Sequence, residues 1–110
     1  LSNLILIIDR NRYIATAGTE EVNSLSSISD KMHSFGFNVI EIDAHNIEEI
    51  YSNLTAINDF KSKKPTVLIA NSVKGKGVSF MENEVSWHHG GIREDTYKKA
   101  KMELETTLGD

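Results

Sequence analysis

The 110-residue chain has no cysteine, one proline and one tryptophan, and its formal net charge is −4. The lack of cysteine excludes disulfide bonds and thiolate metal sites. A net negative charge argues against a broad surface for nucleic acid or for anionic membranes, so we expect neither as a partner. The longest apolar run covers residues 4–8 and is far too short to cross a bilayer.

The first residues also lack the basic segment and the cleavage site of a signal peptide, so we expect a cytoplasmic protein. The chain opens on Leu1 rather than Met, and a strand-like run follows almost at once. We therefore expect these residues to be part of a longer polypeptide.

Alternating strand-like and helix-like segments predict the fold. Continuous apolar runs predict strands at residues 4–8, 38–42 and 66–70, and the Ile-rich first run is typical of a strand buried on both faces. Apolar residues three or four positions apart predict helices at residues 25–35, 47–57 and about 94–108.

Residues around these helices are typical helix ends. Asn23 or Ser24 is expected to cap the start of the first helix, Gly36 to follow its end, and Asn46 to cap the second helix. With right-handed crossovers, the series predicts a three-layer α/β fold with a parallel sheet, present here as a βαβαβα segment.

Ligands of such sheets lie at the carboxyl ends of the strands, where three polar loops are expected at residues 9–18, 43–46 and 71–91. In the first loop, Asp9 and Asn11 offer the hard oxygen atoms that Mg²⁺ or Ca²⁺ prefers. Alternatively, these two side chains close a turn by bonding to the backbone.

The third loop contains "KGKG" and "WHHGG" but neither phosphate-binding glycine motif. Gly75 and Gly77 permit close approach to a ligand, and lysines beside them could meet a phosphate. The alternative is a flexible, solvated turn. The adjacent rings of His88 and His89 are not expected to bind one metal, although one of them could bond a phosphate oxygen or move a proton. Here the alternative is a packed Trp87 with two surface histidines.

Taken in order, "NLILIIDRN", "GTEEV", "FGFNVIEIDAHN", "KPTVLIANSVKGKGVSFMEN" and "WHHG" resemble the thiamine-diphosphate-binding domain of transketolases. The likeness is greatest to the small amino-terminal subunits of split, bacterial-type transketolases and spans nearly the whole chain. It implies a transferase that moves a two-carbon ketol unit between sugar phosphates, with thiamine diphosphate and Mg²⁺ as cofactors.

The resemblance also implies roles for individual residues. Asn11 would bind Mg²⁺ through its side chain and Tyr13 through its carbonyl. His89 would be the catalytic histidine that contacts the cofactor's diphosphate and lies near the substrate. Asp9 would lie beside the cofactor, and the segment 74–77 would shape the approach to the active site.

Four features depart from the usual pattern. Arg10 places a positive charge beside the metal ligands, and after Asn11 "RYIATAG" replaces the usual, one residue shorter "GLQIDG". In addition, "DAHN" replaces the usual "DGHD", and the extra His88 in "WHHG" is a rival to His89. These departures leave the fold prediction intact and leave the sugar substrates open.

The resemblance implies an upstream Gly-Asp-Gly that supplies a further metal ligand, and the sequence contains no such triplet. We therefore expect residues 1–110 to be the carboxyl-terminal half of a thiamine-diphosphate-binding domain. Such a segment would be inactive alone and would work with a pyrimidine-binding domain or carboxyl-terminal subunit in a homo- or hetero-oligomer. The alternatives are a related thiamine-diphosphate enzyme, either similar to deoxyxylulose-phosphate synthase or acting on an unusual sugar, and a non-catalytic α/β module.

Overall fold

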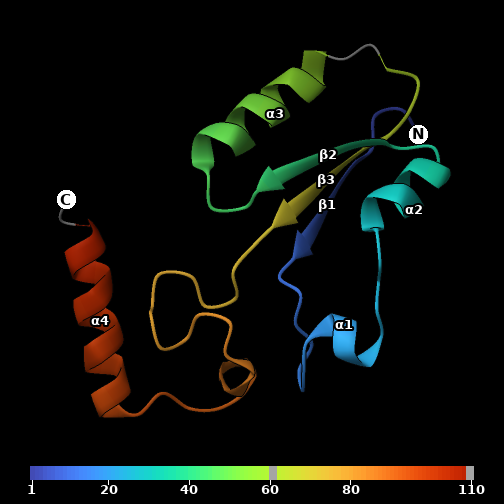
Figure 1. Ribbon diagram of the computed structural model, residues 1–110. Coiled ribbons are helices and arrows are strands. Elements are labelled where there is room, and N and C mark those ends of the chain that lie inside the picture. The colour runs from blue at the N-terminus through green and yellow to red at the C-terminus, as the bar shows by residue number, and fades with distance from the viewer. Residues whose placement is uncertain (60–61, 109–110) are drawn as a thin grey trace. The chain divides into compact units, whose positions relative to one another are not determined.

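The computed structural model describes residues 1–59 and 62–108, arranged as three strands and several helices (Figure 1). The chain divides into two compact units. The first unit contains Leu1–Asn11 and Ser24–Ser72, and the second contains Arg12–Asn23 and Val73–Asp110.

A parallel sheet of three strands forms the first unit. The strands are β1 (Ile5–Arg10), β2 (Asn38–Asp43) and β3 (Thr66–Asn71), in the spatial order β1-β3-β2. In the middle of the sheet, Leu68 of β3 lies opposite Ile7 of β1 and Ile40 of β2. The predicted parallel sheet is confirmed, and each strand ends one or two residues later than the sequence indicated.

The strand order also explains where the helices of the first unit lie. The connection from β1 to β2 passes over β3 and contains α2 (Ile28–Ser34), whereas the connection from β2 back to β3 contains α3 (Ile47–Asp59). Because right-handed crossovers in opposite directions use opposite faces of a sheet, the two helices must cover different faces. Figure 1 shows α2 and α3 on either side of the strands, which is the predicted three-layer arrangement.

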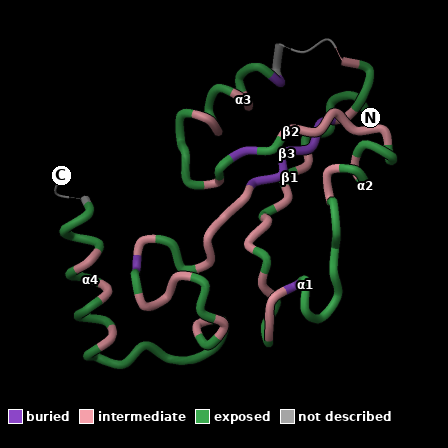
Figure 2. The backbone as a smooth tube through the Cα atoms, viewed as in Figure 1, coloured by how far each residue is buried: buried purple, intermediate pink, exposed green. Residues whose placement is uncertain are grey.

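The core lies around β3. Every residue of β3 from Thr66 to Ala70 is buried, and Figure 2 shows this run as the longest buried stretch of the chain's described part. Leu68 is only 1% exposed and belongs to a cluster with Ile42, Ile57 and Ala70. Ile57 comes from α3, so this helix covers the sheet face to which Leu68 points.

The prediction that the first strand is buried on both faces is wrong for this structure. In β1, side chains are alternately exposed and half-buried, and Ile5 and Ile7 are 37% and 58% exposed. The physical reason is position, because β1 pairs with β3 on one side and lies at an edge of the sheet. The strand buried on both faces is β3.

The start of the first long helix also differs from the prediction. The cap is Ser27, whose side chain accepts a hydrogen bond from the Asp30 N–H at 3.0 Å, rather than Asn23 or Ser24. Ser24 Oγ instead accepts from the N–H of Ser26, whose φ of +49° is left-handed. A left-handed residue cannot continue an α-helix, so the helix begins after it.

The predicted cap of the second long helix is confirmed. Asn46 Oδ1 accepts from the Glu49 N–H at 3.1 Å, and the Glu49 carboxylate accepts from the Asp43 N–H at the same distance. Asp43 in turn accepts from the His45 N–H at 2.8 Å. The short loop at 43–46 is therefore a capping turn that joins β2 to α3.

The second unit contains the short helix α1 (Thr19–Val22), the 3₁₀ helix η1 (Val85–His88) and α4 (Glu94–Leu108). The span of α4 agrees with the prediction. The helix η1 falls in the predicted loop at residues 71–91, and α1 falls between the predicted loop at 9–18 and the first predicted helix. Among the described residues, no helix has the length and apolar character needed to span a membrane.

We predict that Leu68→Ala lowers the free energy of unfolding by about 3 kcal/mol, because it leaves a cavity in the central strand. Ile7→Ala on β1 is the matched control, since it removes a side chain of equal size that is 58% exposed, and it should cost under about 1 kcal/mol. Urea unfolding of the full-length protein measures both values. Equal losses would show that the core does not lie at β3.

Candidate functional site

Two of the three polar loops leave the sheet from neighbouring strands. Asp9 and Arg10 of β1 lie opposite Ala70 and Asn71 of β3. The Ser72 hydroxyl donates to the Asp9 carboxylate, and the Ser72 N–H donates to the Arg10 carbonyl at 3.3 Å. Asp9 therefore bonds to the neighbouring strand's end rather than to a turn of its own. The next residue after β1 is Asn11, which is half-buried.

The segment that carries Tyr13 is a closed loop in the second unit. Arg12 has a left-handed φ of +65°, and Tyr13 forms an isolated antiparallel bridge with Gly18. The loop is closed by Thr19, whose N–H donates to the Arg12 carbonyl at 2.8 Å, with its hydroxyl 3.3 Å from the same oxygen. Thr19 is 9% exposed. Sequence reasoning did not identify it, although it lies in the quoted "GTEEV".

The glycine-rich "KGKG" segment forms a hydrogen-bonded turn, with Gly75 and Lys76 exposed to solvent. Gly75 and Gly77 have φ values of +74° and +97°, and the Asn83 N–H donates to the Lys74 carbonyl at 2.9 Å. A Cβ atom on Gly75 would lie 2.3 Å from the Met81 carbonyl oxygen. The backbone of the same loop therefore lies close to this glycine, and the predicted close approach of a ligand stays a prediction.

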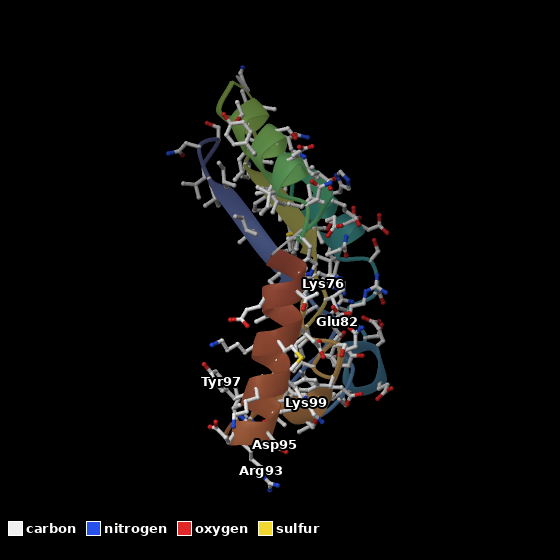
Figure 3. The ribbon with its side chains drawn as sticks, turned by 90° about the vertical axis from the view of Figure 1, so that its left-hand side faces the viewer. Lys76, Glu82, Arg93, Asp95, Tyr97 and Lys99 are labelled. Atoms are coloured by element: carbon white, nitrogen blue, oxygen red, sulfur yellow. The ribbon has the colours of Figure 1, made fainter. Side chains whose placement is uncertain are left out.

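The lysine between the two glycines is engaged within the loop. Lys76 Nζ lies 3.5 Å from a carboxylate oxygen of Glu82, and the Gly77 N–H donates to that oxygen at 3.2 Å (Figure 3). Because the side chain of Lys76 is 51% exposed, the ion pair is weak. Its main effect is to keep the ammonium group close to the loop.

The same loop is bonded to α4. Glu103 accepts from both the N–H and the hydroxyl of Ser79, at 2.6 and 2.9 Å. Val78, the preceding residue, is 6% exposed. The segment from Lys74 to Asn83 is thus bonded within its own turns and to a carboxylate on α4.

Those following residues are Trp87, His88 and His89 of the candidate site. Trp87 and His88 end η1, and His89 comes directly after it. The two imidazole rings stand 4.5 Å apart at 82°, and both residues are exposed. The edge-to-face contact shows that the two rings lie side by side, and the expectation that they do not bind one metal stays a prediction.

The residues predicted as metal ligands have the donor chemistry that Mg²⁺ requires. Asn11 offers an amide oxygen and Tyr13 a backbone carbonyl, and Mg²⁺ commonly takes one or two protein oxygens and completes its shell with phosphate and water. Within residues 1–59 and 62–108, no three His, Asp or Glu side chains gather as a metal cluster. Asn11 belongs to the first unit and Tyr13 to the second. Their assignment to one metal site therefore rests on the sequence alone.

The fold places the chain among parallel α/β proteins, whose ligand sites lie at the carboxyl ends of strands. A family model described as "Transketolase, thiamine diphosphate binding domain" matches residues 1–107. The chain therefore belongs to the transketolase thiamine diphosphate-binding domain family, as its sequence motifs predicted.

Two curated relatives are similar over almost the whole chain. An apulose-4-phosphate transketolase subunit of Phocaeicola vulgatus is 43% identical over 98% of this chain and 38% of its own length. The 6-deoxy-6-sulfo-D-fructose transketolase subunit SqwG of a Clostridium species is 36% identical over 96% of this chain and 38% of its own. The chain thus spans well under half the length of these relatives.

Solved structures agree with the fold. A transketolase from Campylobacter jejuni superposes with a TM-score of 0.82 at 29% identity, covering 94% of this chain and 16% of that one. A transketolase from Pichia stipitis gives a TM-score of 0.81 at 22% identity, covering 94% of this chain and 15% of its own. The likeness to the second protein concerns the fold alone.

We predict that Gly75→Ala destabilises the protein by about 1–3 kcal/mol more than Gly36→Ala, the usual range for overpacking. Gly36 is the matched control, because its φ is +86° and a Cβ there would have no atom within 4 Å. Both variants incur the left-handed penalty, and only Gly75→Ala forces Met81 to move. Thermal unfolding of the full-length protein measures the difference, and equal melting temperatures would contradict the tight turn.

Proposed function

We propose that this chain is part of the amino-terminal subunit of a transketolase that uses thiamine diphosphate and Mg²⁺. The reaction is transfer of a two-carbon ketol unit from a ketose to an aldose. The observation that carries the proposal is the 43% identity over 98% of the chain to a transketolase subunit. The oxygen atoms of Asn11 and Tyr13, which the family resemblance assigns to Mg²⁺, are compatible with it.

We further infer that the donor sugar is an anionic ketose outside the usual transketolase substrates. The two relatives are named for apulose 4-phosphate and for 6-deoxy-6-sulfo-D-fructose, so a phosphate or a sulfonate marks each sugar. Arg10 ends β1 directly before Asn11, "DAHN" follows β2 at the same end of the sheet, and "WHHG" contains His89. Altered loops on a family fold are the expected basis of altered substrate choice.

In this proposal each residue has a limited task. The Asn11 amide oxygen and the Tyr13 carbonyl hold Mg²⁺, which binds the diphosphate, and Asp9 lies beside the cofactor. Bound thiamine diphosphate supplies the carbon nucleophile that breaks and remakes the C–C bond. His89 hydrogen-bonds a diphosphate oxygen and moves a proton to or from a sugar hydroxyl, because histidine exchanges protons near neutral pH.

We also propose that the chain is the carboxyl-terminal half of its domain and acts with a pyrimidine-binding partner. The chain spans 38% of the length of each of the two relatives, and both are named as transketolase subunits. Large apolar side chains stay uncovered here, including Ile7 at 58%, Tyr97 at 52% and Met102 at 67% exposure. Contact with further parts of the enzyme would bury such side chains.

We predict that His89→Ala lowers ketol transfer by about 100-fold or more in the complete two-subunit enzyme, the usual range for loss of a general acid or base. His88→Ala, the neighbouring control, should change turnover by less than about threefold, since it only shares a ring contact with His89. A coupled assay with an anionic ketose donor measures both, and omission of the pyrimidine-binding subunit should abolish turnover. Equal, small effects of the two variants would refute the assignment of His89.

A second prediction concerns cofactor binding. Titration calorimetry with thiamine diphosphate and Mg²⁺ should detect binding by the complete enzyme, and Asn11→Ala should weaken it at least about tenfold. Exposed Asn3→Ala is the control and should leave the affinity unchanged. The 110-residue chain, with its folding checked by circular dichroism, should show no micromolar binding. Micromolar binding by this chain would refute the half-domain proposal.

A further inference from the structure

The single tryptophan makes two contacts with one residue of the preceding loop. The Trp87 Nε1–H donates to the Phe80 carbonyl at 3.1 Å, and the two rings lie with their centroids 5.5 Å apart at an interplanar angle of 56°. Trp87 is half-buried. One side chain thus connects η1 both to the backbone and to the side chain of Phe80.

Phe80 is itself held on both sides. The preceding residue, Ser79, donates two hydrogen bonds to Glu103 of α4. The following residue, Met81, donates its N–H to the Val78 carbonyl at 2.8 Å and lies against Gly75, where no Cβ atom could fit. The Phe80 carbonyl therefore lies between two residues that are both bonded within the second unit.

The contact between Trp87 and Phe80 lies close in sequence to the candidate catalytic residue, His89. His89 lies two residues beyond Trp87, after the end of η1, and its exposed ring meets that of His88 edge to face. An exposed side chain is positioned chiefly through its backbone. The backbone at residues 85–88 is connected to the loop that contains Phe80 through the indole ring.

We propose that Trp87 is a positioning residue that acts through His89: its bond to the Phe80 carbonyl sets the position of the His89 backbone. The role of His89 rests on the proposed function, whereas the contact of Trp87 does not. Catalytic groups need such support, because a displacement of about 1 Å can lower a rate by about 100-fold.

The test uses Trp87→Phe in the complete two-subunit enzyme. Phenylalanine keeps an aromatic ring beside Phe80 and removes the N–H donor, so the change is mild enough for the protein to fold. We expect turnover to fall about tenfold, and amide hydrogen exchange in residues 85–89 to become at least about tenfold faster with β3 unchanged. Phe80→Leu is the matched control, because it removes the ring contact and keeps the accepting carbonyl, and it should have the smaller effect on turnover.

A double-mutant cycle separates positioning from general structural damage. If Trp87 acts through His89, adding Trp87→Phe to His89→Ala should lower turnover no further. An additional tenfold loss in that background would overturn the proposal, and so would unchanged exchange in Trp87→Phe. If His89→Ala is inactive but Trp87→Phe has unchanged turnover, the positioning role of Trp87 is overturned. The proposed function stays intact in that case. If the wild-type enzyme transfers no ketol unit, the proposed function fails, and the exchange measurement still tests the contact of Trp87.

Discussion

The position of β3 between the other two strands determines the rest of the first unit. Its backbone pairs along its full length with β1 on one side and β2 on the other. Its side chains are covered on both faces of the sheet, which leaves Leu68 1% and Val67 0% exposed. A strand so placed must be apolar almost throughout, because each face loses contact with water.

The same pairing sets where chemistry can occur. Parallel pairing in this register brings the carboxyl ends of the strands to one edge, with Asp9 opposite Ala70 and Asp43 opposite Asn71. The polar residues that follow the strands therefore begin from a common, rigid edge. In one of the resulting loops the polar groups cap a helix, and in the other two they include the residues assigned to the cofactor. The sheet thus determines where a ligand site can form, and the residues of the loops determine what that site can bind or catalyse.

Much of this fold could be predicted because apolar patterns report directly on strands and helices. The three strands and the span of α4 follow from such patterns. The burial of β1 could not be predicted, since composition shows which side chains are apolar and not which neighbours cover them. Ile7 is as apolar as Leu68, yet its place on an edge strand leaves it 58% exposed. The predicted start of α2 was wrong because the sequence does not show which of several nearby serines has a left-handed backbone, as Ser26 does.

The candidate site was predictable to a different degree. The order of the motifs indicated the family, which the match to the family model confirms. The assignment of Asn11, Tyr13 and His89 to the site follows from the same motifs and stays a prediction. The contacts that support these residues were not predictable. Ser79 and Glu103 lie 24 positions apart, and nothing in either residue type signals that they meet. Likewise, Gly75 indicated an unusual backbone angle but not the Met81 carbonyl that requires it.

Backbone strain near the proposed ligands shows how such support works. Arg12 adopts a left-handed φ of +65° without being glycine, a conformation that costs about 1–2 kcal/mol. The structure offsets this cost locally, because the Arg12 carbonyl accepts the Thr19 N–H at 2.8 Å and lies near the Thr19 hydroxyl. An outlier held by a buried threonine, one residue before Tyr13, indicates that the carbonyl direction at Tyr13 is constrained by the fold. If Tyr13 binds Mg²⁺ as proposed, its carbonyl would already be oriented, so binding would require less ordering of the backbone.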